Sequence, residues 1–165
     1  MVSATAHLFW IERKKTVSKP YTGYTGVKDS GEAIEMLVDL CKRRWRATSL
    51  GTYADRDKRG KPGQKSVHAD YRAADLDFPT LEAKKKACAT LAGLYGVELI
   101  IDYAYRGPLR NAFGRAWRCD RARWRNLKRG EVSGGGQAWA NFIHVEVAPG
   151  TDPERLEKAF RATPK

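Results

Sequence analysis

Two short segments of this sequence alternate apolar and polar residues in a way that limits how the chain can fold. In residues 142–147 every second residue is a branched apolar one, so an extended chain would bury one face and present His144 and Glu146 together on the other. Residues 73–78 alternate in the same manner, and Asp75 lies on their polar face. Each segment therefore predicts a strand with one apolar face. Each also carries a potential metal ligand opposite that face.

A helix is predicted to begin near Glu32 and to end near Arg46. Asp29 and Glu32 resemble a capping box at its start. Apolar residues then recur at helical spacing and predict one buried face, formed by Ile34, Leu37, Val38, Cys41 and Trp45.

Two further helices follow along the chain. The second is predicted from Thr80 to about Tyr95, with Leu81 on its buried stripe and Gly96 ending it. Thr151 with Glu154 resembles another capping box, which opens a C-terminal helix at about 152–161.

Between the helices the pattern is of short strands and loops. Residues 47–53 predict a short strand or turn, and 97–101 predict a central strand. Residues 54–65 are polar and contain glycine, so we expect an exposed loop, and 103–130 show no periodicity. The element order predicts an α+β fold, with a small, mainly antiparallel sheet and helices packed on it.

The length of 165 residues predicts a single domain, 1–165, with its core at about 32–147. Three cysteines without a CxxC pair argue against a disulfide framework, and Cys41 and Cys88 are expected to be buried free thiols. The first residues show no basic segment followed by a long apolar one, so we expect no secretory signal. No apolar run is long enough to predict a membrane span.

The net charge is +12, and the excess is concentrated in two segments. Residues 41–65 hold nine basic and two acidic side chains, and residues 103–130 hold nine basic and one acidic. Such a charge favours a polyanionic partner, either nucleic acid or an anionic cell-wall polymer, although it also serves solubility. In 103–130 the arginines are interleaved with aromatic residues, a mixture that could stack on bases, cover a carbohydrate groove or pack an irregular loop.

The sequence contains three histidines, and two of them stand near carboxylates. His68, Asp75 and His144 would make a three-ligand set for a hydrolytic metal such as zinc, leaving a fourth position for water. The alternative is that His68 is an ordinary loop histidine and His144 a hydrogen-bonded residue on a strand face. The spacing alone leaves both interpretations open.

The order of these motifs resembles the zinc D-alanyl-D-alanine carboxypeptidase and L-alanyl-D-glutamate endopeptidase family, which cuts peptidoglycan stem peptides. The first motif of that family, Ser-x-His followed after six residues by Asp, is matched by Ser66, His68 and Asp75. The final strand of the type His-Val-Glu-Val is matched at residues 144–147. A looser match, at 49–56, stands where the family has a Ser-Gly-Tyr-Arg-like segment.

This resemblance implies that His68, Asp75 and His144 bind Zn²⁺, and that Arg56 and Ser66 contribute to substrate binding. It implies a phage-type cell-wall lysin: a monomeric enzyme made in the cytoplasm that acts at the wall after release. Its partners would be peptidoglycan stem peptides, together with anionic wall polymers.

The chain departs from the family at one position, three residues before the last histidine. The family has an Asp or Glu there as the catalytic acid and base, whereas this chain has Asn141, whose amide cannot accept a proton near neutral pH. Glu146 or Asp77 could substitute as the base. A zinc-binding domain with weak or lost hydrolysis, and a basic nucleic-acid-binding protein that uses residues 103–130, are the alternative functions.

Overall fold

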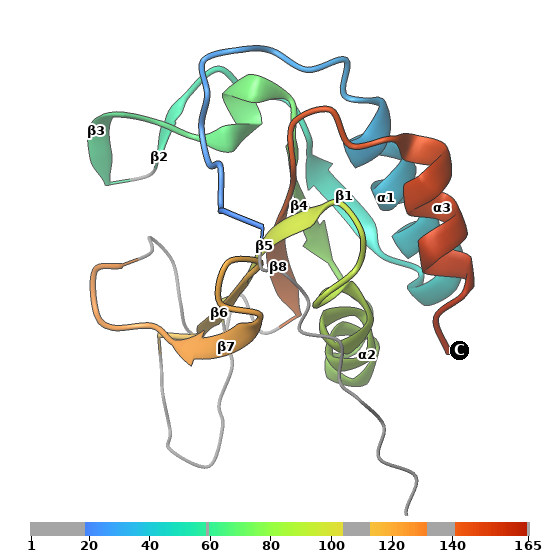
Figure 1. The fold of residues 1–165 in the computed structure, drawn as a ribbon. Helices are drawn as coiled ribbons and strands as arrows, with labels where there is room; N and C mark the ends of the chain where they lie inside the picture. The colour runs from blue at the N-terminus through green and yellow to red at the C-terminus, as the bar shows by residue number, and fades with distance from the viewer. Residues whose placement is uncertain (1–18, 59, 104–112, 132–140, 165) are drawn as a thin grey trace, which may run out of the picture.

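The computed structural model describes residues 19–58, 60–103, 113–131 and 141–164. Its described residues form a six-stranded sheet with helices packed on it, which confirms the predicted α+β fold (Figure 1). Every pair of neighbouring strands is antiparallel. In spatial order the strands are β1 (Thr48–Gly51), β4 (Ala73–Asp77), β8 (Phe142–Val147), β5 (Val97–Asp102), β6 (Arg115–Arg118) and β7 (Arg123–Asn126).

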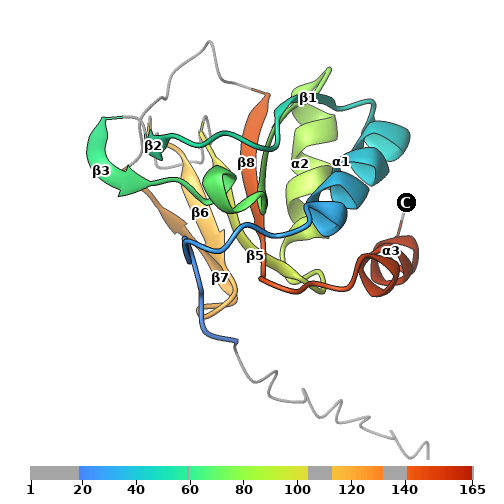
Figure 2. The same ribbon diagram turned by 90° about the horizontal axis from the view of Figure 1, so that it is seen from above.

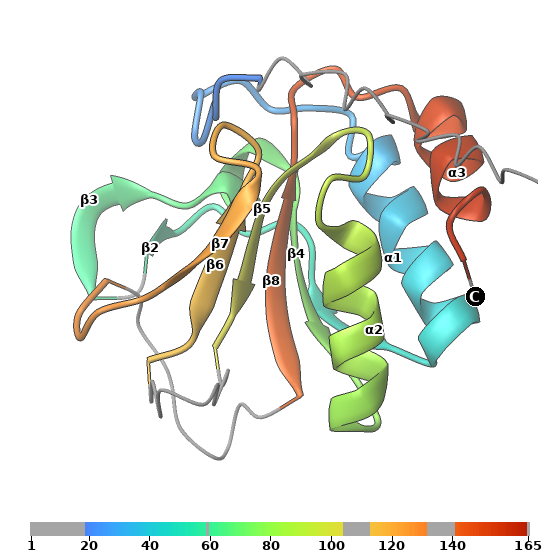
Figure 3. The same cartoon turned by 60° about the horizontal axis from the view of Figure 1, so that its bottom comes forward.

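The helices all lie on one side of this sheet. They are α1 (Glu32–Trp45), α2 (Leu81–Leu91) and α3 (Pro153–Arg161), and Figure 2 and Figure 3 show them together on the same face. Helix α2 connects β4 to β5, and β8 inserts between these two strands, antiparallel to both. A hairpin of β2 (Asp57–Lys58) and β3 (Lys61–Lys65) lies on the opposite side, followed by the 3₁₀ helix η1 (Val67–Asp70).

The alternation of apolar and polar residues in β4 and β8 has the predicted effect on one face of the sheet. Ile143, Val145 and Leu76 are fully buried in the core between sheet and helices, where they meet the apolar face of α1. Burying these branched side chains stabilises the fold by about 1.5–3 kcal/mol each. The other face of β8 is also covered, because His144 and Glu146 are 7% and 4% exposed. The polar side chains there are therefore held inside the protein.

Both predicted capping boxes are wrong in detail, although the helices begin where they were expected. Gly31 is the N-cap of α1, and no side chain caps it; Asp29 instead accepts a hydrogen bond from the Gly31 N–H. In α3 the N-cap is Asp152, whose carboxylate accepts from the N–H groups of the two residues after Pro153. Aspartate is the better cap here because it adds a negative charge at the helix N-terminus.

Helix α2 is shorter than its sequence suggests. It begins where it was predicted to, and the side chain of Thr80 caps it. It ends at Leu91, before the predicted end near Tyr95. Leu81 was expected on the buried stripe and is 47% exposed. Cys88 and Cys41 are buried free thiols as predicted, and burial raises the pKa of each thiol to about 12.

Two segments predicted to be irregular contain strands. The polar segment 54–65 includes the β2–β3 hairpin, and the basic segment 103–130 includes the β6–β7 hairpin, while residues 104–112 lie outside the described part. In the second hairpin Trp117 and Trp124 are register partners. Trp117 belongs to the core and Trp124 packs against it. Arginines alternate with Trp124 in β7, but in β6 they stand at 115 and 118, on opposite faces, and this obscured the period of two.

An N-terminal strap, residues 21–26, contacts the start of β5, the end of β8 and the turn η1, and it binds buried carboxylates there. It consists of two Tyr-Thr-Gly triplets. Each threonine donates hydrogen bonds from its backbone N–H and its hydroxyl to one carboxylate, Thr22 to Glu98 and Thr25 to Asp70. The guanidinium of Arg72 lies between these carboxylates, 3.0 Å from Asp70 and 3.6 Å from Glu98. The tandem triplet thus serves a buried ion-pair network.

No helix in the described part of the chain is long and apolar enough to cross a membrane.

Candidate metal centre

The first part of the site is built by η1, which carries His68. Ser66 caps this single turn, and its side chain accepts a hydrogen bond from the His68 N–H at 3.4 Å. Tyr71 ends the turn in the left-handed conformation. The turn aims the His68 ring inward, where it is 2% exposed. Ser66, expected to bind substrate, is itself buried and supports this turn.

The other two residues come from neighbouring strands. Asp75 on β4 and His144 on β8 are direct register partners, so their side chains leave the sheet side by side. The sheet also separates them from the apolar core, because both lie on the face opposite the helices. Residues that are 69 positions apart in sequence are thereby fixed within hydrogen-bond distance.

The hydrogen bond made by His68 determines which of its nitrogens is available. Nδ1 lies 2.9 Å from the carbonyl oxygen of Thr52, which can only accept, so Nδ1 carries the proton. Nε2 is then a lone pair in the neutral ring. It lies 3.3 Å from Asp75 Oδ2, is buried, and has no hydrogen-bond partner within the described residues. A lone pair facing a carboxylate oxygen at this distance is the arrangement that a bound cation would stabilise.

His144 is held from both sides. Its Nε2 lies 2.9 Å from Glu146 Oε1, and its Nδ1 lies 2.9 Å from Asp75 Oδ1. The second oxygen of Glu146 accepts a 2.8 Å hydrogen bond from the hydroxyl of Tyr21, in the N-terminal strap. Glu146 thus orients the His144 ring so that Nδ1 points at the Asp75 carboxylate.

These contacts shift the pKa values of Asp75, His144 and Tyr21. Burial lowers the pKa of His144, but the hydrogen bonds to Asp75 and Glu146 outweigh this effect and raise the pKa to about 9. Burial would raise the pKa of Asp75, and the hydrogen bond from His144 is the largest effect that holds it well below its usual range. The pKa of Tyr21 is raised by burial and by the Glu146 charge. The centre is therefore anionic at its carboxylates at neutral pH.

The three residues could hold a metal ion. One ligand atom each from His68, Asp75 and His144 lie within 4.8 Å of one another. The atoms that face each other are His68 Nε2, the Asp75 carboxylate and His144 Nδ1, since the other ring nitrogens are bound to Thr52 and Glu146. Metal-binding histidines are commonly oriented in this way by an oxygen on the second nitrogen. The set predicted from the sequence is thus brought together.

The remaining predicted site residues are placed differently. Arg56 lies at the rim, with a guanidinium nitrogen 3.4 Å from Asp75 Oδ2 and 43% of its side chain exposed. Its backbone carbonyl accepts from Ser66, so the segment before the β2–β3 hairpin runs beside η1. Asn141 stands immediately before β8, and its carbonyl accepts from the Phe78 N–H at 3.1 Å. Asp77 is exposed and lies two residues beyond Asp75 on the same strand face. The catalytic roles suggested for Asn141 and Glu146 stay predictions.

Three supporting residues were not found from the sequence. They are Thr52, whose carbonyl fixes His68; Glu35 on α1, whose carboxylate accepts hydrogen bonds from Thr52 and Tyr71; and Tyr21. A backbone carbonyl leaves no mark in sequence. Of the three, only Tyr21 could have been noticed in the sequence, because its Tyr-Thr-Gly triplet is repeated directly after it, at 24–26.

A scan against protein-family models, a search of curated proteins and a search of solved structures each found no match to this chain.

Proposed function

We propose that this protein binds Zn²⁺ through His68 Nε2, the Asp75 carboxylate and His144 Nδ1. The observation that carries the proposal is the pair of outer hydrogen bonds, which leave one nitrogen of each imidazole facing the same carboxylate. Two nitrogens and a carboxylate suit zinc better than calcium or magnesium, which prefer oxygen ligands. Three protein ligands also leave a coordination position for a substrate or water.

The reaction that this set favours is the hydrolysis of peptide bonds in peptidoglycan stem peptides. The proposal is supported by the ligand set and by the motif order of Ser66, His68, Asp75 and His144. When bound, zinc would supply a polarised carbonyl and a water of lowered pKa. Arg56 is the exposed cation beside Asp75, where it would pair with a substrate carboxylate.

Hydrolysis also needs a base to accept a proton from the attacking water, and none of the described residues near the site is clearly suited to this role. Asn141 is neutral, and both oxygens of Glu146 are already engaged by His144 and Tyr21. For Glu146 to act as the base it would have to give up one of these partners. A zinc-binding domain with weak or lost hydrolysis is therefore the second candidate, and Asn141 is the observation that favours it.

The net charge of +12 favours anionic partners. We place the enzyme at the cell wall, made in the cytoplasm, released as a monomer and held by anionic wall polymers. Nucleic acid is the weaker candidate, because arginines of the β6–β7 region are paired with carboxylates: Arg118 with Asp120 at 2.6 Å and Arg125 with Glu131 at 2.8 Å.

Zinc quantitation combined with a peptidoglycan digest tests both parts of the proposal. Purified protein should hold one equivalent of zinc, and mass spectrometry of digested peptidoglycan should reveal new peptide termini. Asp75→Asn should abolish zinc retention, while Asp77→Asn, on the same strand face but outside the ligand set, should retain it.

The outcomes separate the two candidates. Zinc retention without new termini, together with sharply increased cleavage by Asn141→Asp, would establish a binding domain that has lost its base. Absence of zinc from the wild-type protein, with the same stability in His68→Ala and His144→Ala, would refute the metal site itself.

A further inference from the structure

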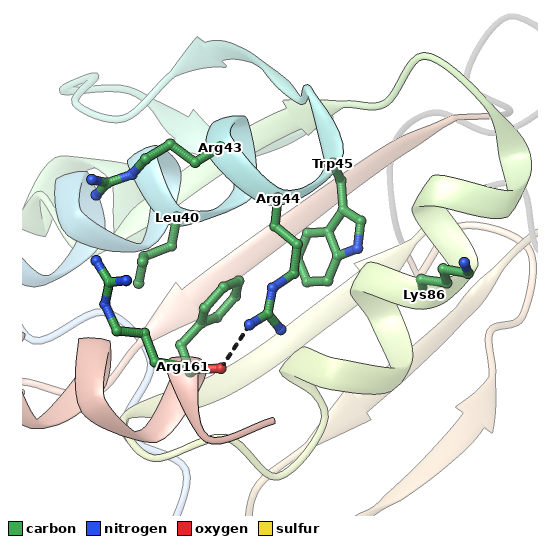
Figure 4. Close-up of a pocket in the computed structure, with 7 residues that line it drawn as sticks. Leu40, Arg43, Arg44, Trp45, Lys86 and Arg161 are labelled. Carbon is green, nitrogen blue, oxygen red and sulfur yellow. Dashed lines mark hydrogen bonds between the residues drawn. The ribbon is translucent and has the colours of Figure 1, made fainter. Parts of the chain in front are cut away.

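A second site lies on the helical side of the molecule, away from the metal centre. It is a pocket of about 450 Å³ where the C-terminal ends of α1 and α3 meet the middle of α2 (Figure 4). Its floor is apolar, and four cationic side chains surround it. The floor is formed by Leu40, Trp45 and Phe160, and the cations are Arg43, Arg44, Lys86 and Arg161.

The cations of this pocket are only partly neutralised. Arg161 pairs with Glu157 at 2.6 Å, but no carboxylate of the described residues lies within ion-pair distance of Arg43, Arg44 or Lys86. No acidic residue lines the pocket. The lining therefore carries a net positive charge, which favours the binding of an anion.

One of the arginines is held in a fixed orientation. Arg44 donates to Thr163 Oγ1 at 2.6 Å and to the Phe160 carbonyl at 3.1 Å, and its guanidinium lies 4.1 Å from the centre of the Phe160 ring. Figure 4 shows Arg44 beside Trp45 in the middle of the pocket, with Arg43 and Arg161 on one side and Lys86 on the other. The polar rim is thus arranged around the apolar floor.

Helix ends explain part of this charge. Arg43, Arg44 and Arg161 stand in the last turns of α1 and α3, where the helix dipole favours cations. This effect does not apply to Lys86, which lies in the middle of α2, a helix with no basic residue in its last turn. Three separate helices therefore contribute cationic residues to the lining of one pocket.

We propose that this pocket binds a small ligand bearing a phosphate group. Guanidinium groups recognise phosphate oxygens through paired hydrogen bonds, and a phosphate dianion matches several cations better than a single carboxylate does. The apolar floor receives an organic group attached to the phosphate, and the volume lies within the range of small-molecule sites. This site is independent of the metal centre and of the reaction there.

Titration calorimetry at low ionic strength, with inorganic phosphate, pyrophosphate and phenyl phosphate as probes, tests the pocket in the full-length protein. We expect saturable binding, with phenyl phosphate binding more tightly than inorganic phosphate because of the floor. The variant Arg43→Gln with Lys86→Gln should weaken phenyl phosphate binding by about tenfold or more.

The matched control is Lys42→Gln with Lys85→Gln. These residues are the sequence neighbours of Arg43 and Lys86, they are exposed, and they carry the same charge without lining the pocket. The control should bind as the wild type does, and circular dichroism should show both pairs folded. Equal loss in the two pairs would mean general surface attraction and would overturn the proposal, as would the absence of saturable binding. Tight binding of an oligonucleotide that lacks terminal phosphate, weakened alike in both pairs, would point instead to a nucleic-acid surface.

Discussion

At the scale of single residues, the proposed metal centre depends on Glu146 as much as on His68, Asp75 and His144. Its carboxylate holds the Nε2–H of His144 and thereby keeps Nδ1 directed at Asp75. Replacing the charge with an amide retains the shape but weakens this orientation.

Glu146→Gln should therefore lower zinc affinity by about 10- to 100-fold. Competition with a chromogenic chelator would measure this change. Asp77→Asn serves as the control, since Asp77 is an exposed carboxylate outside the ligand set. If Glu146→Gln binds zinc as tightly as the wild type does, Glu146 does not orient His144 for metal binding.

The raised pKa of His144 predicts opposite pH dependences with and without metal. In the metal-free protein the folded-state pKa is about 9, above the ordinary value of 6.5. The stabilisation by protonated His144 is therefore fully present below pH 6.5 and lost as the pH rises through about 9. Zinc displaces that proton, so zinc affinity should instead increase over the same range.

Urea unfolding at several pH values, with zinc and with a chelator, checks these signs. The chelated protein should lose stability between pH 6.5 and about 9, and His144→Gln should lose less over this interval. A metal-free stability that rises through this interval would contradict the assigned ionisation.

At the scale of the elements, the start of α1 depends on a glycine rather than on a side-chain cap. Gly31 has φ +82°, and a Cβ there would lie 2.6 Å from Tyr71 Cε1. Tyr71 in turn donates to Glu35, the residue that also binds Thr52 beside His68. A side chain at position 31 would thus disturb a contact that leads to the metal centre.

Gly31→Ala should destabilise the protein by about 3 kcal/mol, from backbone strain plus the clash. Gly93→Ala is the control, because Gly93 has a similar φ of +87° with nothing within 4 Å. It should cost only about 1–2 kcal/mol. Thermal unfolding of both variants measures the difference, and equal costs would show that Tyr71 yields without penalty.

The elements also show how far sequence reasoning extends. The strand faces of residues 73–78 and 142–147 were predictable, because apolar residues at every second position leave one face for the core. The β6–β7 hairpin was not, since arginines stand on both faces of β6. One of them, Arg115, lies 3.2 Å from Asp102, a buried partner that only the tertiary fold supplies. His68, Asp75 and His144 could be recognised in the sequence as possible ligands because of their side chains. The role of the Thr52 carbonyl could not be predicted, since every residue has a backbone carbonyl.

At the scale of the whole molecule, Arg72 joins parts of the chain that are far apart in sequence. Its buried guanidinium donates to the carbonyls of Gly23 in the N-terminal strap and Val147 at the end of β8, and it contacts Asp70 and Glu98. The strap, η1, β5 and β8 therefore meet at one side chain. Removing it leaves two buried carboxylates without their cation.

Arg72→Ala should destabilise the protein by about 3–5 kcal/mol. Glu82→Ala, an exposed carboxylate-to-alanine change in the first turn of α2, provides a reference for an ordinary surface substitution. Chemical denaturation of both proteins measures the costs. A cost below about 1 kcal/mol for Arg72→Ala would mean that the network adds little to stability.

The position of β8 in the sheet has a consequence for biosynthesis. This strand lies between β4 and β5 but is translated after both of them and after the β6–β7 hairpin. A nascent chain that has emerged as far as β7 therefore has two open strand edges that face the same vacant slot, which invites pairing with other chains. It also holds His68 and Asp75 without His144. Closing the sheet and bringing His144 beside Asp75 are thus one late event in folding, and both depend on the same six residues of β8.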